Sequence, residues 1–117
     1  MTVETELSAA LAVLCPRVFP VSADFGTQAP YVVWQHVGGQ SLRFLDNTAG
    51  DKRNSFIQIT AWAATSKAAF GLARAIEEAL CESAVMQVAP QGEPVDAYDD
   101  GNHLRGALQT FSIWATR

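Results

Sequence analysis

Basic residues are scarce in this chain, and they form no basic run anywhere along it. Lysine and arginine together number 8 against 12 aspartates and glutamates, which gives a formal net charge of -4 at pH 7. Proteins that hold nucleic acid neutralise its phosphates with clustered basic side chains. The composition therefore predicts a protein that does not bind DNA or RNA specifically.

Long apolar runs and paired cysteines are also lacking. No stretch approaches the roughly 18 apolar residues of a membrane-spanning helix, and the opening MTVETELSAA carries glutamates rather than lysines. We therefore expect no membrane span and no secretory signal. Cys15 and Cys81 lie far apart without the spacing of a metal site, which favours two reduced thiols in a cytosolic protein.

Recognisable catalytic, metal-binding and phosphate-binding motifs are missing as well. His36 falls in a predicted strand and is expected at the surface or in a hydrogen bond. The group that most resembles a metal site is Asp96, Asp99, Asp100 and His103. Its spacing does not match a calcium loop, so a solvated acidic turn is expected. The sequence predicts no active site, no metal and no cofactor.

Hydrophobic residues make up 49% of the chain, and two stretches have the period of a helix. Residues 3–14 carry one apolar stripe, and Pro16 ends this predicted helix. Residues 67–82 carry a second stripe rich in alanine, with Thr65 or Ser66 as the N-cap. The alanines allow this helix to approach a sheet closely.

Strands are predicted where β-branched and aromatic residues follow one another, with loops where proline and glycine gather. The predicted strands cover residues 31–37, 55–63, 84–90 and 104–116. Residues 17–30 and 91–103 are expected to be loops. We therefore expect a single domain over residues 1–117 with an α+β fold. Its mostly antiparallel four-stranded sheet carries both helices on one face, in the order α-β-β-α-β-β.

The second predicted strand, which contains FIQITAWA, is apolar on both faces. Its isoleucines and alanines are expected against the helices, whereas Phe56 and Trp62 point the other way. We expect this opposite face to carry Trp114 and either Trp34 or Tyr31 as well. Two explanations stay open: the first helix or the long loops cover these aromatics, or the subunit packs against copies of itself. The second makes Trp34, Phe56, Trp62 and Trp114 candidate interface residues.

A long loop, GGQSLRFLDNTAGDKRN over residues 38–54, connects two strands that we expect to pair as a hairpin. Its 17 residues exceed the usual hairpin connection of about two to five. The loop combines apolar and basic side chains: Leu42, Arg43, Phe44, Leu45, Lys52 and Arg53. It is either a mobile hairpin tip or a tip that docks into a partner, since long loops in compact domains tend to be functional.

Four segments follow one another in an order that resembles a known family: LCPRVFP, APYVVWQHVGG, IQITAWAATSKAAFGLARAIEEAL and YDDGNHLRGALQTFSIWA. From Pro16 to Ala115 the chain resembles the tail completion, or tail terminator, proteins of long-tailed bacteriophages and prophages. The resemblance rests on PYVV opening a strand, on the strand-to-helix passage from Trp62 to Leu80, and on the YDD turn before the last strand. These are patterns of fold rather than of catalysis.

The resemblance implies a structural protein that is not an enzyme. Members of this family look like subunits of a ring, typically a hexamer, that caps the finished tail tube, stops its polymerisation and offers the docking surface for the head connector. The implied partners are copies of the chain, the tail tube protein and the head connector protein, while DNA passes through without specific binding. The implied location is the host cytoplasm during assembly and then the tail of the virion.

Two other functions stay open. A head–tail connector or neck protein that binds the portal side is also structural, and the partner that it captures would distinguish it. A small-molecule-binding α+β domain would use the sheet as the floor of a pocket. That function predicts a concave apolar cavity near Trp34 and Trp62.

Overall fold

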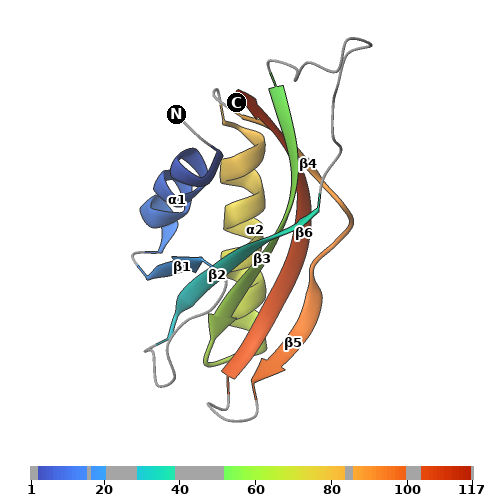
Figure 1. Ribbon diagram of the computed structural model, residues 1–117. Coiled ribbons are helices and arrows are strands. Elements are labelled where there is room, and N and C mark those ends of the chain that lie inside the picture. The colour runs from blue at the N-terminus through green and yellow to red at the C-terminus, as the bar shows by residue number, and fades with distance from the viewer. Residues whose placement is uncertain are drawn as a thin grey trace.

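The computed structural model describes residues 3–15, 17–20, 29–38, 52–83, 86–99 and 104–116 (Figure 1). Within these residues two helices and six strands follow in the order α-β-β-β-α-β-β-β. They are α1 (Val3–Leu14), β1 (Val18–Pro20), β2 (Tyr31–Gly38), β3 (Lys52–Ala63), α2 (Ser66–Cys81), β4 (Gln87–Pro90), β5 (Val95–Asp99) and β6 (Leu104–Thr116).

The sheet corrects the sequence-based prediction in three respects. It has six strands rather than four, and the order α-β-β-α-β-β is wrong because β1 and β5 were expected to be loops. The path of neighbouring strands is β1-β2-β3-β6-β4, and β5 also pairs with β6. The sheet is mixed, because β1 pairs with β2 in parallel whereas the other pairs are antiparallel. The α+β class and the two helices agree with the prediction.

The centre of the sheet is the long antiparallel pair of β3 and β6. The pairing runs without a shift from Lys52 opposite Thr116 to Ala63 opposite Arg105. Because side chains alternate along a strand, every second residue of both strands faces the helices. On that face the two strands bury Ile57, Ile59, Ala61, Ala63, Ala107, Phe111 and Ile113.

Helix α2 covers this face with a stripe of small and aliphatic residues. Ala69, Ala73, Ile76 and Leu80 are its buried residues, and the two alanines allow the helix axis to come close to the strands. The helix begins at Thr65, whose hydroxyl oxygen accepts a hydrogen bond from the backbone N–H of Ala68 at 3.2 Å. This contact identifies Thr65 as the N-cap that the sequence left open.

Helix α1 packs beside α2 on the same face of the sheet (Figure 1). Leu7 and Leu11 are fully buried and belong to the same core cluster as the residues of α2 and β3. Helix α1 therefore does not cover the opposite face. Neither helix in the described residues is long and apolar enough to cross a membrane.

Candidate interaction surface

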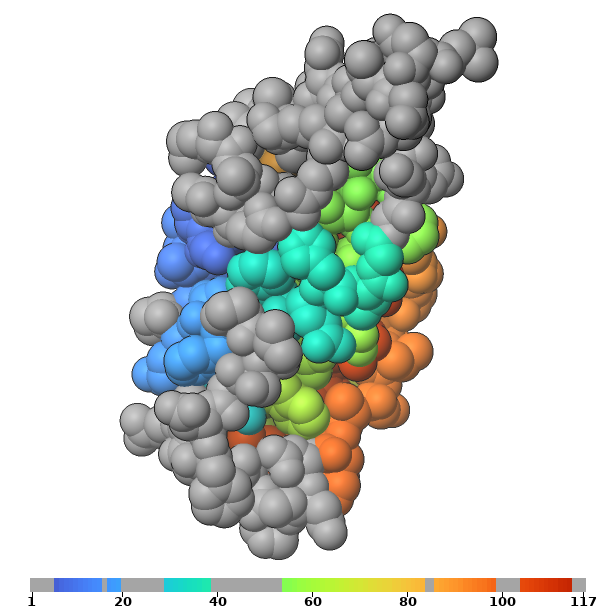
Figure 2. Space-filling view, viewed as in Figure 1, coloured from blue at the N-terminus to red at the C-terminus, as the bar shows by residue number. Residues whose placement is uncertain are grey.

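We call the face of the sheet that points away from both helices the outer face. It carries most of the aromatic residues that the sequence predicted for an interface. The strand registers place Phe56 and Trp62 of β3 on it, with Tyr31 of β2 and Trp114 of β6. Figure 2 shows β1, β2, β3, β6 and the β4–β5 segment following one another across one side of the molecule. Phe56, Trp62 and Trp114 are half-buried within the chain.

Trp34 lies on the helix face rather than on the outer face. It pairs in register with Ile59, belongs to the core cluster and is 6% exposed. The outer face instead receives Tyr31, which pairs with Trp62. The structure therefore brings Trp34 to the opposite side of the sheet from Phe56, Trp62 and Trp114, and an interface role for these four residues stays a prediction.

At one end of the outer face three rings form a row across the strands, called here the aromatic row: Phe19, Tyr31 and Trp62. The centroids of Phe19 and Tyr31 lie 6.2 Å apart, edge to face, and those of Tyr31 and Trp62 lie 6.4 Å apart. Trp62 continues across β6 over Gly106, its partner in register. A Cβ atom on Gly106 would lie 2.9 Å from Cε3 of Trp62, so the glycine leaves room for the indole ring.

Phe56 and Trp114 lie at the other end of the outer face. Phe56 pairs with Ser112, which makes Trp114 its diagonal neighbour across the strands. Six positions of β3 separate Phe56 from Trp62, which corresponds to about 20 Å at the rise of a strand. Between the two ends the face has no aromatic ring on β3: Thr60 lies between Val33 and Leu108, and Nε2 of Gln35 donates a hydrogen bond of 3.2 Å to Oε1 of Gln58. The outer face thus has two aromatic ends rather than one continuous aromatic patch.

The predicted docking loop falls almost entirely outside the described residues. Leu42, Arg43, Phe44 and Leu45 are not among them. Lys52 and Arg53 begin β3, where their backbones pair with Thr116 and Ala115, so β3 starts earlier than expected. Strands β2 and β3 are antiparallel neighbours, as the hairpin prediction requires. Whether the loop binds a partner stays a prediction.

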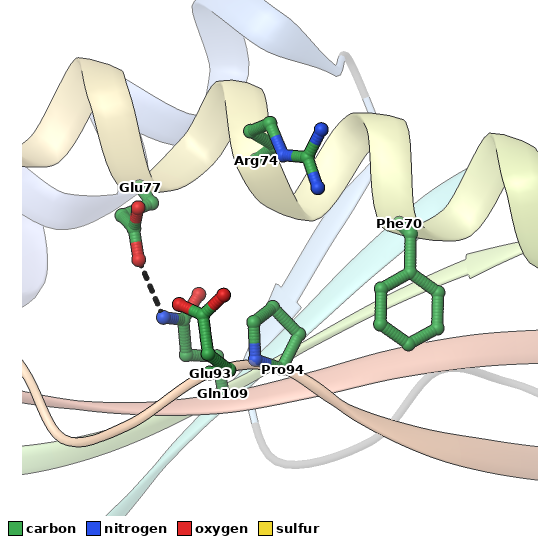
Figure 3. Close-up of a pocket in the computed structure, with 6 residues that line it drawn as sticks. All are labelled: Phe70, Arg74, Glu77, Glu93, Pro94 and Gln109. Carbon is green, nitrogen blue, oxygen red and sulfur yellow. Dashed lines mark hydrogen bonds between the residues drawn. The ribbon is translucent and has the colours of Figure 1, made fainter.

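A recess between α2 and the strands, called here the α2 recess, is a feature that the sequence analysis missed (Figure 3). It has a volume of about 150 Å³ and is lined by Phe70, Arg74, Glu77, Glu93, Pro94 and Gln109. Gln109 of β6 is 3% exposed and lies on the helix face among hydrophobic residues. The position was readable from the sequence, because Gln109 alternates with Ala107 and Phe111.

A family model described as "Tail completion protein gp17" matches residues 4–116, nearly the whole sequence. The chain belongs to this family. The match confirms the resemblance seen in the sequence and identifies a phage tail completion protein, a component of the virion. No curated protein matches the chain.

The acidic segment of the tail completion protein is only partly described. Asp96 and Asp99 lie in β5, whereas Asp100 and His103 are outside the described residues. On the neighbouring strand the guanidinium carbon of Arg105 lies 4.2 Å from the centroid of the Tyr98 ring. Within the described residues no group of three or more histidine, cysteine or acidic side chains could hold a metal ion.

Both cysteines of the tail completion protein are free thiols. Cys15 is buried, and its Sγ lies 3.5 Å from the carbonyl oxygen of Pro30, to which the thiol donates. Cys81, at the end of α2, has its pKa raised by partial burial and then by the carboxylates of Glu77 and Glu82. A raised pKa lowers the thiolate fraction, so Cys81 is a poor nucleophile near neutral pH.

Proposed function

We propose that this tail completion protein is a terminator subunit, which acts as a single domain over residues 1–117. Copies assemble into a ring, six in number, that caps the tail tube. The ring stops tube polymerisation and provides the surface on which the head connector docks. Family membership supports a structural role in the tail. The outer face supports assembly, because both helices pack on the opposite side and leave Phe56, Trp62 and Trp114 half-buried.

The two edges of the sheet support a head-to-tail arrangement of subunits. One edge is the short parallel strand β1, and the other is formed by β4 and β5, which pair with successive parts of β6. These edges differ in length, direction and sequence, so contact between them is heterologous. Heterologous contacts generate a ring when the rotation between subunits closes. The outer face forms a second part of the contact between copies, with Phe56 and Trp62 on β3 and Trp114 on β6.

In this proposal the loop over residues 38–54 engages the tail tube or the connector. Its support is the combination of length with the apolar and basic residues Leu42, Arg43, Phe44, Leu45, Lys52 and Arg53. The apolar side chains would insert into the partner, and the basic ones would pair with acidic groups around the contact. The subunit performs no bond chemistry, works in the host cytoplasm during assembly and remains in the virion.

The acidic balance of the subunit suits a ring through which DNA slides. A formal net charge of -4 disfavours the retention of phosphates in the channel. The absence of a basic run in the sequence argues in the same direction. A gel-shift titration at physiological salt is expected to show no specific complex with DNA.

Mixing the protein with tail tubes and imaging them by negative stain tests the function directly. The expected result is a cap at one end of each tube and no further elongation when tube protein is added. Trp114→Ser is expected to weaken capping, since it removes an outer-face ring. Val13→Ser is the matched control, because Val13 lies on α1 and is 85% exposed. Tubes that elongate normally with saturating protein, or equal loss from both variants, would contradict the proposal.

The small-molecule function is not favoured by the arrangement of the described residues. It predicted one apolar cavity near Trp34 and Trp62, but these two residues lie on opposite faces of the sheet. A connector that binds the portal side instead of the tube would be recognised in the same imaging experiment. Binding to portal rings without binding to tube ends would replace the terminator function.

A further inference from the structure

Gln109 is a polar side chain at a core position, and its amide is only partly paired. Its Nε2 donates to Oε1 of Glu77 at 2.7 Å and to the backbone oxygen of Gly92 at 2.8 Å. Both partners are acceptors, so they fix the orientation of the amide. Its Oε1 is buried without a hydrogen-bond partner. A buried acceptor without a donor costs free energy and calls for an explanation.

The α2 recess beside the Gln109 side chain supplies acceptors but few donors. Figure 3 shows Gln109 projecting from β6 towards α2, with Glu77 and Arg74 above it and Glu93 beside Pro94. The α2 recess is thus lined by two carboxylates, those of Glu77 and Glu93, against a single guanidinium, that of Arg74. Among the described residues, Arg74 forms no ion pair with either glutamate. The recess therefore carries a net negative charge with hydrogen-bonding capacity left over.

Two of the residues that line the recess are apolar. The Phe70 ring comes from α2, and Pro94 comes from the connection between β4 and β5. An alkyl stem with a cationic head fits this arrangement, because the stem packs on apolar walls while the head donates to the carboxylates. A guanidinium group also stacks favourably on a phenylalanine ring. An anion would meet the two carboxylates, and a purely apolar group would leave them unpaired.

We propose that the α2 recess binds a basic side chain, arginine or lysine, from a protein partner in the tail. The cationic head donates to the carboxylates of Glu93 and Glu77, and the stem lies against Phe70 and Pro94. Arg74 competes for the same acceptors. That the partner is another tail protein rests on the function proposed above, whereas the binding chemistry rests on the recess alone.

Titration of the ¹⁵N-labelled protein with N-acetyl-arginine methylamide, followed by NMR, tests the recess. Saturable shifts are expected at the Gln109 side-chain amide and at the Glu93 backbone, with a dissociation constant in the millimolar range. The norleucine analogue of the probe, which has a stem and no charge, is expected to cause none. Saturable shifts elsewhere but not in the recess, or equal binding of the norleucine analogue, would overturn the proposal.

Three variants distinguish binding of the probe in the recess from non-specific attraction of a cationic probe to an acidic protein. Glu93→Gln removes one acceptor at an exposed position and is expected to weaken the probe about two- to fivefold. Arg74→Ala removes the competing cation and is expected to strengthen binding. Glu78→Gln is the matched control, since Glu78 is exposed on α2 but does not line the recess. An equal effect of Glu78→Gln and Glu93→Gln would refute the assignment.

Tube capping tests the proposed function, whereas binding of the arginine probe tests the recess, so the two claims can fail separately. If the wild-type protein binds the arginine probe but caps no tubes, the terminator function is wrong and the recess assignment stands. If it caps tubes but shows no saturable response to the probe, the recess assignment is wrong and the terminator function stands. A capping protein that loses affinity for tubes on Glu93→Gln, but not on Glu78→Gln, supports both.

Discussion

Substituting Gly106 by alanine tests the contact that holds the aromatic row against the sheet. Gly106 is buried in β6 and lies directly opposite Trp62 in the register. The added Cβ would lie 2.9 Å from Cε3 and 3.0 Å from Cζ3 of Trp62, and 3.2 Å from Cβ of Ala97. Carbon atoms pack best at about 3.5–4.0 Å, so the indole ring must move. Tyr31 restricts that movement from β2.

Two opposing effects set the size of the change in unfolding free energy that Gly106→Ala causes. Overpacking of a tight site costs about 1–3 kcal/mol of unfolding free energy. Replacing a glycine in a strand returns about 0.5–1 kcal/mol, because the unfolded chain loses conformational freedom. We therefore expect Gly106→Ala to lower the free energy of unfolding by about 0.5–2 kcal/mol. The corresponding fall in melting temperature is roughly 2–8 °C for a chain of this size.

Urea unfolding followed by far-UV circular dichroism measures the effect, since tryptophan fluorescence would report on Trp62 itself. Gly71→Ala is the matched control, because nothing lies within 4 Å of a Cβ at this position in α2. It is expected to stabilise the protein by about 0.8–1 kcal/mol. In a Trp62→Ala background Gly106→Ala should lose most of its cost, because only the contact of 3.2 Å with Cβ of Ala97 remains. If Gly106→Ala stabilises the wild-type protein as much as Gly71→Ala does, the packing of Trp62 on Gly106 is wrong.

Three further predictions concern the core, the helix start and the exposed thiol. Phe111→Ala, at a fully buried position, is expected to lower the unfolding free energy in urea titrations by about 3–5 kcal/mol, and a loss below 1 kcal/mol would contradict its place in the core. Thr65→Ala removes the N-cap of α2 and is expected to cost about 1 kcal/mol, whereas Thr65→Asp should retain most of the stability. Iodoacetamide at pH 8 is expected to alkylate Cys81 more slowly than a free cysteine, because its pKa is raised by burial, Glu77 and Glu82. Glu82→Gln should accelerate the reaction, and an unchanged rate would exclude that carboxylate as a cause.

The sequence predicted well those helices and strands in which buried and exposed side chains recur at regular intervals. The predicted helix over residues 67–82 differs by one residue at each end from α2, because its apolar stripe and the threonine N-cap are both local signals. The alternation in FIQITAWA likewise identified β3, since its isoleucines face the helices. Long strands and helices that bury one face can therefore be recognised from a single sequence.

The strands that were missed lack such a pattern. Val95 and Tyr98 of β5 are 56% and 48% exposed, so no alternation of buried and exposed residues marks this strand. Strand β1 has three residues, among them Pro20, and it forms by pairing with β2 from a distant part of the sequence. Whether either segment forms a strand depends on pairing with a neighbouring strand, and the local sequence does not show which segments pair.

The placement of Trp34 shows a related limit. Both alternating sets of β2 contain an aromatic residue and a valine, so the sequence did not determine which set faces the helices. Gln109 shows the opposite case, because its spacing from Ala107 and Phe111 already placed a polar residue in the core. A polar residue in phase with core positions is therefore a signal worth following, even in a chain without catalytic motifs.

The two aromatic ends of the outer face differ in what they do within one subunit, and this decides how assembly should be tested. Trp62 stacks beside Tyr31 and over Gly106, so its removal is expected to destabilise the monomer as well as any contact between copies. Trp114 lies near the end of β6, opposite Asn54 and beside Gln87 of the short strand β4. Substitution there should affect ring formation with a smaller loss of unfolding free energy. A capping defect in Trp114→Ser with an unchanged urea midpoint would therefore be a defect of assembly, whereas the same defect in Trp62→Ser would not distinguish assembly from folding.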